Sequence, residues 1–264
     1  AHIEITHRVA AQAEIPLAPL EASTLTGAAD AIMRVLRSSP RLREHRSQMT
    51  RPASEETRTP ADPVIVVEHL SHTYTPGTPY ATESLHDVSF SVRPGELLGI
   101  VGHSGSGKST LIQHLNGLIR PAPGVIRVLG MDPSVNADIR KIRQRVALLF
   151  QYPEHQLFEE TVFEDVAFGP RKMGLDKQEV ERRVREAAQV VGLSEADLQR
   201  SPFELSGGQK RRAAIAGVLS MEPDILVLDE PAAGLDPAGR DEILGYVASL
   251  RERGITILLV SHSM

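Results

Sequence analysis

The sequence contains no cysteine and no tryptophan, and only 4% of its residues are aromatic. The absence of cysteine excludes disulfide frameworks and cysteine-based zinc sites, and it suits a reducing compartment. No apolar run approaches the ~20 residues that a membrane-spanning helix needs. The start of the sequence shows no signal-peptide pattern. We therefore expect any role at a membrane to depend on a partner protein.

A strong charge of one sign is also lacking. The formal net charge is -5, from 29 Lys and Arg against 34 Asp and Glu. Nucleic-acid-binding proteins usually carry a basic stripe, and none dominates here, so we expect no nucleic-acid partner. The short basic run Lys210-Arg211-Arg212 is interpreted as the solvated face of a helix.

The chain changes in character near residue 63. Residues 24–36 have the pattern of a short amphipathic helix, and 38–63 are rich in Pro, Ser, Thr, Arg and Glu. We interpret 1–62 as an extension or linker that is disordered, with a functional tail or the end of a preceding domain as alternatives. Residues 63–264 are predicted to form one folded domain.

Beyond residue 63, β-branched runs alternate with helical patterns. Strands are predicted at 64–67, 85–92, 96–101, 125–129, 146–150, 225–228 and 255–260. Helices are predicted at about 108–118, 177–191, 208–221 and 238–251. This alternation predicts an α/β fold with a largely parallel sheet and helices on both faces. Residues 152–205, mostly helical and polar, are interpreted as an inserted helical subdomain.

A Gly-rich segment between a predicted strand and helix carries the first chemical motif. It runs Gly102-His103-Ser104-Gly105-Ser106-Gly107-Lys108-Ser109-Thr110 and has the GxxxxGKS pattern of a phosphate-binding loop. Its glycines let backbone N–H groups turn toward phosphate oxygens, and the next helix directs its N-terminus at the same anion. Lys108 adds positive charge, Ser109 can bind Mg²⁺, and the His103 side chain needs no role. Alone, the loop fits a kinase, a GTPase or a motor ATPase.

An apolar strand that ends in two carboxylates forms the second motif. Asp229 and Glu230 follow the predicted strand 225–228. A buried strand would hold Asp229 beside the phosphate loop, where it can bind the Mg²⁺ shell. Glu230 could orient and deprotonate the attacking water. The two motifs together predict ATP hydrolysis.

A third motif, Leu205-Ser206-Gly207-Gly208-Gln209, lies between the other two and carries a resemblance. With them, the chain resembles the ATP-binding-cassette ATPases. The resemblance implies a P-loop NTPase (RecA-like) parallel sheet core, an antiparallel β subdomain and an inserted helical subdomain. Ser206 and the glycines open a helix whose N–H groups can face an anion. In this family the anion is the γ-phosphate of ATP bound on the other subunit.

The resemblance implies roles for further residues. Gln151 matches the glutamine that contacts Mg²⁺ and responds to the transporter, and His262 matches the histidine that contacts the γ-phosphate. Ala233-Gly234-Leu235-Asp236 matches the loop that crosses the dimer interface. Tyr74 matches the aromatic residue that stacks on adenine, with nearby Tyr80 as an alternative.

A narrower resemblance covers about residues 64–264. Gln151-Tyr152-Pro153-Glu154-His155-Gln156-Leu157-Phe158 and the segment 160–170 resemble the ATPases of energy-coupling factor transporters, which import vitamins and transition-metal ions. Residues 202–212 and 261–264 resemble the second of their two paralogous ATPases. The resemblance implies ATP and Mg²⁺ as cofactors and a peripheral place at the cytoplasmic face of the cell membrane. The implied partners are the paralogous ATPase in a head-to-tail dimer, a transmembrane coupling subunit and a substrate-binding membrane subunit.

Two departures and two alternatives accompany this resemblance. Ala232 stands where many relatives have threonine, and the lost hydroxyl is peripheral. The chain ends at Met264, where the family continues with a dimerisation region, so we expect a C-terminally truncated domain. A soluble cassette acting on ribosomes or DNA is the alternative function, although tandem cassettes and coiled-coil insertions are not seen. A binding module without turnover is disfavoured by Glu230 and His262. The sequence does not indicate the transported substrate.

Overall fold

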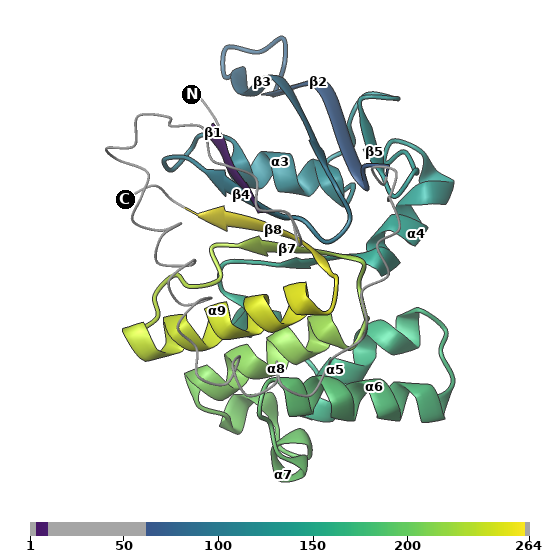
Figure 1. Ribbon diagram of the computed structural model, residues 1–264, viewed down its shortest axis with the longest axis vertical. Coiled ribbons are helices and arrows are strands. Elements are labelled where there is room, and N and C mark those ends of the chain that lie inside the picture. Colours follow the sequence, from purple (N-terminus) through teal and green to yellow (C-terminus); the bar gives the residue numbers. More distant parts are fainter. Residues whose placement is uncertain (1–3, 10–61, 262–264) are drawn as a thin grey trace, which may run out of the picture.

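The fold consists of two β-sheets with helices packed against them (Figure 1). The computed structural model describes residues 4–9 and 62–261. The larger sheet contains, in spatial order, β1 (Glu4–Val9), β4 (Leu97–Val101), β8 (Thr256–Ser261), β7 (Ile225–Asp229) and β6 (Val146–Leu149). The smaller sheet contains β3 (Thr82–Val92), β2 (Ile65–Tyr74) and β5 (Ile126–Val128), all antiparallel.

The helices follow the strands along the chain. They are α3 (Lys108–Leu115), α4 (Asn136–Arg145), α5 (Val162–Lys172), α6 (Lys177–Val190), α7 (Glu195–Leu198), α8 (Gly207–Leu219) and α9 (Pro237–Glu252), with short 3₁₀ turns η1 (Pro153–Gln156) and η2 (Pro202–Glu204). The elements from η1 to η2 fall within the segment 152–205, which the sequence predicted to be helical.

The register of the larger sheet brings four loops to one edge. β4, β8, β7 and β6 are mutually parallel, with Val101 opposite Ser261 and Asp229 opposite Val260. The carboxyl ends of these strands therefore lie together. In open α/β sheets this edge is where ligands bind. The phosphate-loop pattern follows β4, and the carboxylate pair Asp229 and Glu230 lies at the end of β7.

Alternate residues of the central strands point to opposite faces of the sheet and enter two separate cores. Val227, Leu258 and Val260 pack with α3 and the smaller sheet. Leu226 and Leu228 pack with α5, α6, α8 and α9. Figure 1 shows the same layers, with α3 on one side of β4, β8 and β7, and α5, α6, α8 and α9 on the opposite side. The phosphate-loop helix and the helix that follows the Ser-Gly-Gly motif therefore lie on opposite faces.

The predicted α/β fold is confirmed, and the predicted strands and helices of residues 64–261 are all present. Their bounds lie within a few residues of those expected, except that the strand predicted at 64–67 continues to Tyr74 as β2. α4 was not predicted. Its sequence is mostly polar and buries only Ile142, so it lacks the apolar periodicity that marks an amphipathic helix.

The N-terminal segment departs from expectation at one place. Glu4–Val9 was included in an extension predicted to be disordered, and it instead pairs antiparallel with β4 as the edge strand β1. Ile5, Thr6 and Val9 are β-branched, which suits a strand, but six residues carry too short a pattern to be decisive. The predicted helix at 24–36 and the linker at 38–61 lie outside the described residues.

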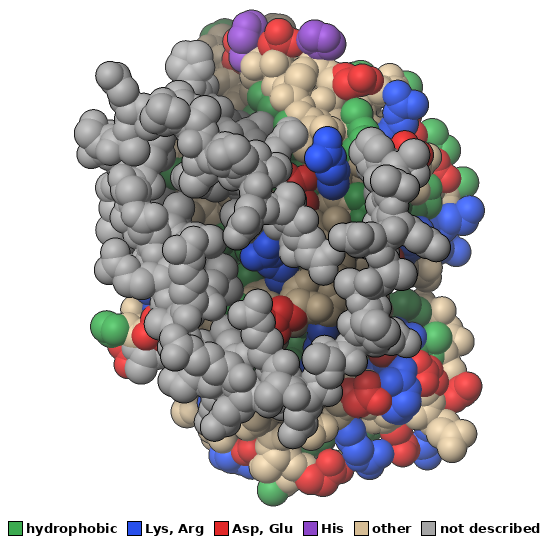
Figure 2. All heavy atoms as spheres, in the orientation of Figure 1, with side chains coloured by type: hydrophobic (Ala, Val, Ile, Leu, Met, Phe, Trp, Pro, Cys, Tyr) green, Lys and Arg blue, Asp and Glu red, His purple; other side chains and the backbone are tan. Residues whose placement is uncertain are grey.

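The surface of the helical region carries charges of both signs. On α6, Arg182 is paired with Glu179 and Glu186, and Arg185 with Glu181. Figure 2 shows acidic and basic side chains interspersed over the lower part of the molecule. Among the residues that the structure describes, no helix has both the length and the apolar character needed to cross a membrane.

Candidate nucleotide site

The loop between β4 and α3 is shaped by glycines in left-handed backbone conformations. Gly105 has φ 77° and Gly107 has φ 97°, and Gly107 is the N-cap residue of α3. A Cβ atom at Gly107 would lie 2.3 Å from the Ser84 carbonyl oxygen of β3. Only glycine fits there, because both the conformation and the space exclude a side chain. The loop therefore packs closely against β3 of the smaller sheet.

Lys108 holds the two sides of this loop together. Its Nζ donates to the carbonyl oxygens of Gly102, at 2.7 Å, and His103, at 2.9 Å, although the residue is only 4% exposed. Ser106 is buried as well, and its N–H donates to His103 O. The ammonium group therefore lies at the mouth of a loop that is built to bind an anion. His103 Nδ1 lies 2.8 Å from the neighbouring Ser104 carbonyl oxygen, and the expectation that this side chain needs no role stays a prediction.

The first residues of α3 meet the end of β7. The Ser109 hydroxyl donates to Asp229 Oδ2 at 3.3 Å, across 120 positions of sequence. Asp229 is buried at the end of its strand. A hydroxyl and a carboxylate side by side are the oxygen donors that Mg²⁺ prefers, so these residues fit that ion.

Glu230 and Gln151 meet at the same edge. Gln151 Nε2 donates to Glu230 Oε2 at 3.1 Å, again between distant segments. Glu230 has a φ of 49°, which is unusual for a residue other than glycine, and its N–H donates to Val260 O at 3.0 Å. Strained backbone of this kind concentrates at functional sites. Residues at the ends of three strands, β6, β7 and β8, therefore fix the position of Glu230.

Thr110 links the phosphate-loop helix to the smaller sheet. Its hydroxyl lies 3.1 Å from the Tyr74 hydroxyl and 2.9 Å from Ser84 Oγ. Tyr74 is 42% exposed and is fixed to α3, whereas Tyr80 is 83% exposed and its backbone bonds only within its own turn. The contact favours Tyr74 over Tyr80 as a platform beside the loop.

A pair of histidines lies behind Tyr74. The His72 ring packs edge-on against Tyr74 at 4.6 Å and against His114 at 4.8 Å between centroids. His114 Nδ1 lies 2.7 Å from the Thr110 carbonyl oxygen. Burial lowers the pKa of His114, and the nearby His72 adds to this effect. His114 therefore lies behind Tyr74 with a pKa below the ordinary value for histidine.

The Ser-Gly-Gly motif starts α8. Ser206 is the N-cap and forms a reciprocal capping box with Gln209, whose Nε2 also donates to Asp197 Oδ1 at 3.0 Å. Ser206, Gly207 and Gly208 are exposed. Since α8 lies on the face of the sheet opposite α3, the fold does not bring this motif together with the phosphate loop of the same chain.

Two outcomes complete the comparison with the sequence. His262 lies outside the described residues, so its role stays a prediction. Arg211, interpreted from sequence as part of a solvated face, is 6% exposed, and that interpretation is wrong for this residue. It shares a helical stripe with buried Ile215 and Leu219 at intervals of four residues, a signal that could have revealed its burial.

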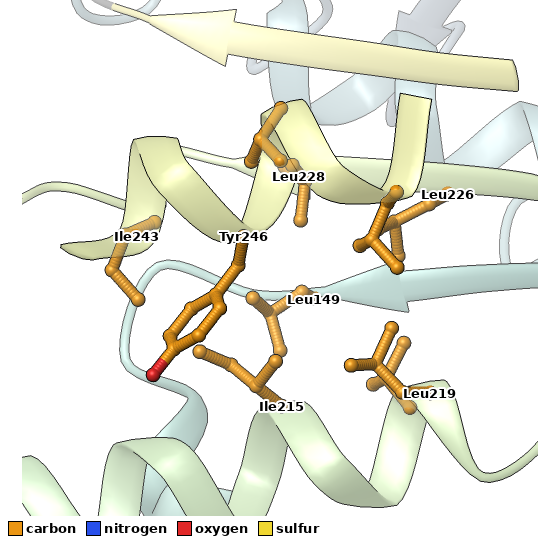
Figure 3. Close-up of a pocket in the computed structure, with 10 residues that line it drawn as sticks. Leu149, Ile215, Leu219, Leu226, Leu228, Ile243 and Tyr246 are labelled. Carbon is orange, nitrogen blue, oxygen red and sulfur yellow. The ribbon is translucent and has the colours of Figure 1, made fainter. Parts of the chain in front are cut away.

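A cavity on the other face of the sheet is unrelated to this site. Figure 3 shows Leu226 and Leu228 of β7 facing Ile215 and Leu219 of α8 and Tyr246 of α9 across it. Its volume is about 20 Å³, and its lining is apolar. It offers no donor for a phosphate group.

The sequence profile of one family, described as ABC transporter, matches residues 85–233. This match covers more than half of the chain and spans the phosphate loop, the Ser-Gly-Gly motif and the carboxylate pair. The chain belongs to the ABC transporter family. The predicted ATP binding and ATP hydrolysis are confirmed by this membership.

Comparison with individual relatives indicates which members of the family this chain resembles. It is 62% identical to an energy-coupling factor transporter ATP-binding protein EcfA2 of Symbiobacterium thermophilum, over 76% of this chain and 70% of that protein. It is 53% identical to EcfA2 of Bacillus subtilis, over 71% and 69%. The predicted resemblance to energy-coupling factor ATPases is confirmed.

Solved structures agree with the fold of the cassette. The structure of cbiO1 from Clostridium perfringens, described as part of the ABC transporter complex cbiONQ, has a TM-score of 0.67 and 39% identity, covering 76% of this chain and 79% of that one. A dimeric ATP-binding cassette MJ0796 bound to ADP and Pi has a TM-score of 0.66 and 27% identity, covering 75% and 87%.

Proposed function

We propose that this cassette is the ATP-hydrolysing subunit of an energy-coupling factor importer, bound peripherally at the cytoplasmic face of the membrane. It would power uptake of a vitamin or a transition-metal ion through membrane partners. The observation that carries the proposal is the meeting of the Ser109–Asp229 and Gln151–Glu230 pairs at one edge of the sheet. The names of its EcfA2 relatives support the transporter assignment.

ATP binding is assigned to the loop 102–110. Its backbone N–H groups and the Lys108 ammonium would receive the phosphates, and the adenine would stack on Tyr74. Ser109, Gln151 and Asp229 would hold Mg²⁺, which, when bound, neutralises negative charge on the phosphate oxygens. The Lys108 bonds to the Gly102 and His103 carbonyl oxygens hold this ammonium group beside the loop.

Hydrolysis is assigned to Glu230. Its carboxylate would accept a proton from the water that attacks the γ-phosphorus, and the bond from Gln151 fixes the orientation of that carboxylate. His262 would contact the γ-phosphate, as the family resemblance implies. The leaving group is ADP, and the γ-phosphoryl group ends as inorganic phosphate.

The Ser-Gly-Gly motif is assigned to an ATP site that is shared with another subunit. The exposed N-terminus of α8, with Ser206 as its cap, would bind the γ-phosphate of ATP held by a paralogous ATPase in a head-to-tail dimer. The dimeric state of the MJ0796 cassette supports this arrangement. Each ATP would then lie between the phosphate loop of one subunit and the Ser-Gly-Gly motif of the other.

The test of hydrolysis is Glu230→Gln. We expect this variant to bind ATP with unchanged affinity, to lose turnover, and to accumulate as a nucleotide-bound closed dimer with its paralogue. Glu252→Gln, which changes an exposed carboxylate at the end of α9, is the control and should behave as the wild type. Normal ATP hydrolysis by Glu230→Gln would show that the base is another group.

An exposed aromatic cluster fits the membrane partner. The Phe158 ring is 60% exposed and packs edge-on against Phe168 at 5.0 Å, with Lys172 Nζ 5.2 Å from the Phe168 ring. Asp165 holds this surface in shape, since its Oδ1 accepts from the N–H groups of Phe158 and Glu159. We assign the cluster to a coupling helix of the transmembrane subunit, because amphipathic helices dock through apolar contacts of this kind.

The test of this surface is recovery of the complex from detergent-solubilised membranes. Phe158→Ala combined with Phe168→Ala should reduce recovery of the transmembrane subunit while nucleotide binding is retained. Phe203→Ala, at another exposed phenylalanine, is the matched control for loss of an aromatic ring. Full recovery of the complex with the double variant, or recovery of the chain only with ribosomes or DNA, would contradict the assignment.

A further inference from the structure

Arg211 is a buried cation for which the assigned reaction steps have no use. It lies in the second turn of α8, five residues after the N-cap Ser206, and is 6% exposed. A buried charge is costly unless it is well hydrogen-bonded, so the acceptors that surround it indicate what it does.

The acceptors of Arg211 are backbone carbonyl oxygens from two other segments. One terminal nitrogen donates to Pro231 O at 2.5 Å and lies 3.5 Å from Gln151 O, and the other donates to Ala233 O at 3.4 Å. The guanidinium is a rigid planar fork, so it can hold several acceptors at fixed mutual positions. A lysine carries the same charge but presents it as a single point.

These carbonyl groups flank the proposed catalytic pair. Pro231 follows Glu230 directly, and the Ala233 N–H donates back to Glu230 O at 3.0 Å. Gln151 is the residue whose side chain donates to the Glu230 carboxylate. Arg211, in the helix that Ser206 begins, therefore contacts the main chain of Gln151 and the main chain of Pro231 and Ala233, which follow Glu230.

We propose that Arg211 is a positioning residue that fixes Gln151 and Glu230 relative to each other and to the start of α8. The inference rests on the proposed ATPase function. ATP binding depends on the loop 102–110 and does not need Arg211, whereas hydrolysis depends on the orientation of the Glu230 carboxylate. Loss of Arg211 therefore lowers kcat and leaves nucleotide affinity nearly unchanged, because small misplacements of reacting groups have large effects on rate.

Arg183 of α6 provides a matched control, because its guanidinium lies against Met221, just beyond the other end of α8. Its guanidinium is also mostly buried, donating to Met221 O at 3.2 Å and to Glu179, and pairing with Glu222. Arg183→Gln and Arg211→Gln each remove a guanidinium that holds an end of this helix. Only Arg211 contacts the segments of Gln151 and Glu230.

The first measurement is ATP turnover and nucleotide binding in the assembled transporter. Arg211→Gln should lower kcat by about 10- to 100-fold, with a nucleotide Kd close to that of the wild type. Arg211→Lys should recover part of the loss, and Arg211→Gln should have a smaller effect when Gln151→Ala is already present. A kcat that falls no more than in Arg183→Gln would assign Arg211 a structural role alone and overturn the inference.

The second measurement does not need turnover. Backbone amide exchange of the isolated chain should accelerate at 150–153 and 229–235 in Arg211→Gln and be unchanged there in Arg183→Gln. Equal protection in both variants would overturn the inference. A wild-type transporter without ATP hydrolysis would instead contradict the proposed function, and the exchange experiment would still decide whether Arg211 links the two segments.

Discussion

Two parts of the cassette that we assign to phosphate binding are held in place by very different contacts. The phosphate half comprises residues 102–110, Gln151, Asp229 and Glu230, and its side-chain hydrogen bonds join positions 120 and 79 residues apart. The signature half comprises residues 206–209, and its bonds reach only 3 to 12 residues along the chain. The phosphate half depends on several strands of the sheet, whereas the signature half depends on local contacts at the N-terminus of one helix.

This difference indicates what each half can do alone. The phosphate half collects a loop, a hydroxyl, an amide and two carboxylates from one chain, so we expect a single chain to bind a nucleotide there. The signature half presents exposed N–H groups on the other side of the molecule, with its own cap already satisfied. The following variants separate the two halves.

Lys108→Ala should produce the largest effect, because it removes the cation from the phosphate half. We expect ATP hydrolysis to fall by about 100-fold or more and nucleotide affinity to fall with it. ATPase rates and equilibrium nucleotide binding measure the two losses. Lys141→Ala, at an exposed lysine of α4, is the control. Undiminished nucleotide binding by Lys108→Ala would contradict the assignment of the loop.

Ser206→Ala should separate the halves, because it should spare nucleotide binding by the single chain and slow hydrolysis in the dimer by about 10-fold. Ser194→Ala is closely matched, since Ser194 caps α7 through the same kind of capping box. Both changes should cost about 1 kcal/mol of stability. Equal ATPase rates in the two dimeric variants would show that Ser206 acts only as a helix cap.

Acid should affect the two sides of the sheet in opposite directions. Burial lowers the pKa of His114 on the phosphate side, so its stabilising contribution is complete above 6.5 and is lost as pH falls below that value. Burial raises the pKa of Asp165 on the side of α8, so protonation there favours the folded state as pH falls toward 3.8. Each group contributes at most about 1.4 kcal/mol per pH unit.

Urea unfolding measured from about pH 4 to about pH 8 gives these contributions. His and Asp groups with such pKa shifts titrate in this range. His114→Gln should flatten the loss of stability below pH 6.5, the ordinary pKa of histidine. Asp165→Asn should remove the gain at lower pH while keeping an acceptor for the Phe158 and Glu159 N–H groups. An unchanged pH profile in either variant would contradict the assignment of that residue.

Val247→Ile should have the smallest effect, a gain of at most about 0.8 kcal/mol, because the added methylene group can enter the cavity beneath α9. Val92→Ile adds the same group to the fully buried core on the phosphate side and should destabilise by about 1 to 3 kcal/mol through overpacking. Thermal unfolding measures both. A loss of stability in Val247→Ile would show that the cavity cannot accept the group.

Much of the phosphate half could be predicted because its residues stand where strands end. Val101 and Asp229 close apolar strands, and parallel strands bring their carboxyl ends together. The pairing of Gln151 with Glu230 could not be derived from spacing alone, since it depends on the strand order. The match of Tyr74 to the adenine-stacking position rests on the family resemblance and stays a prediction, and the contact with Thr110 supports it over Tyr80.

Other features had a weak local signal or none. Arg211 shares a helical stripe with Ile215 and Leu219, but it stands in a polar run, and the carbonyl groups that accept from it come from distant segments. β1 is a short segment far from the rest of the domain along the sequence, and no sequence pattern indicates that it pairs with β4. α4 buries a single large side chain, so its periodicity is faint. In each case the deciding contact is made by a distant part of the chain.

The contact between Gly107 and the Ser84 carbonyl also limits how this cassette could be re-engineered. The smaller sheet supplies part of the wall that shapes the phosphate loop, so the two cannot be exchanged separately between proteins. A chimera that receives a foreign β3 would need to keep the backbone path at Ser84, even if every loop residue were preserved. The three-stranded sheet therefore helps to determine the shape of the proposed nucleotide site.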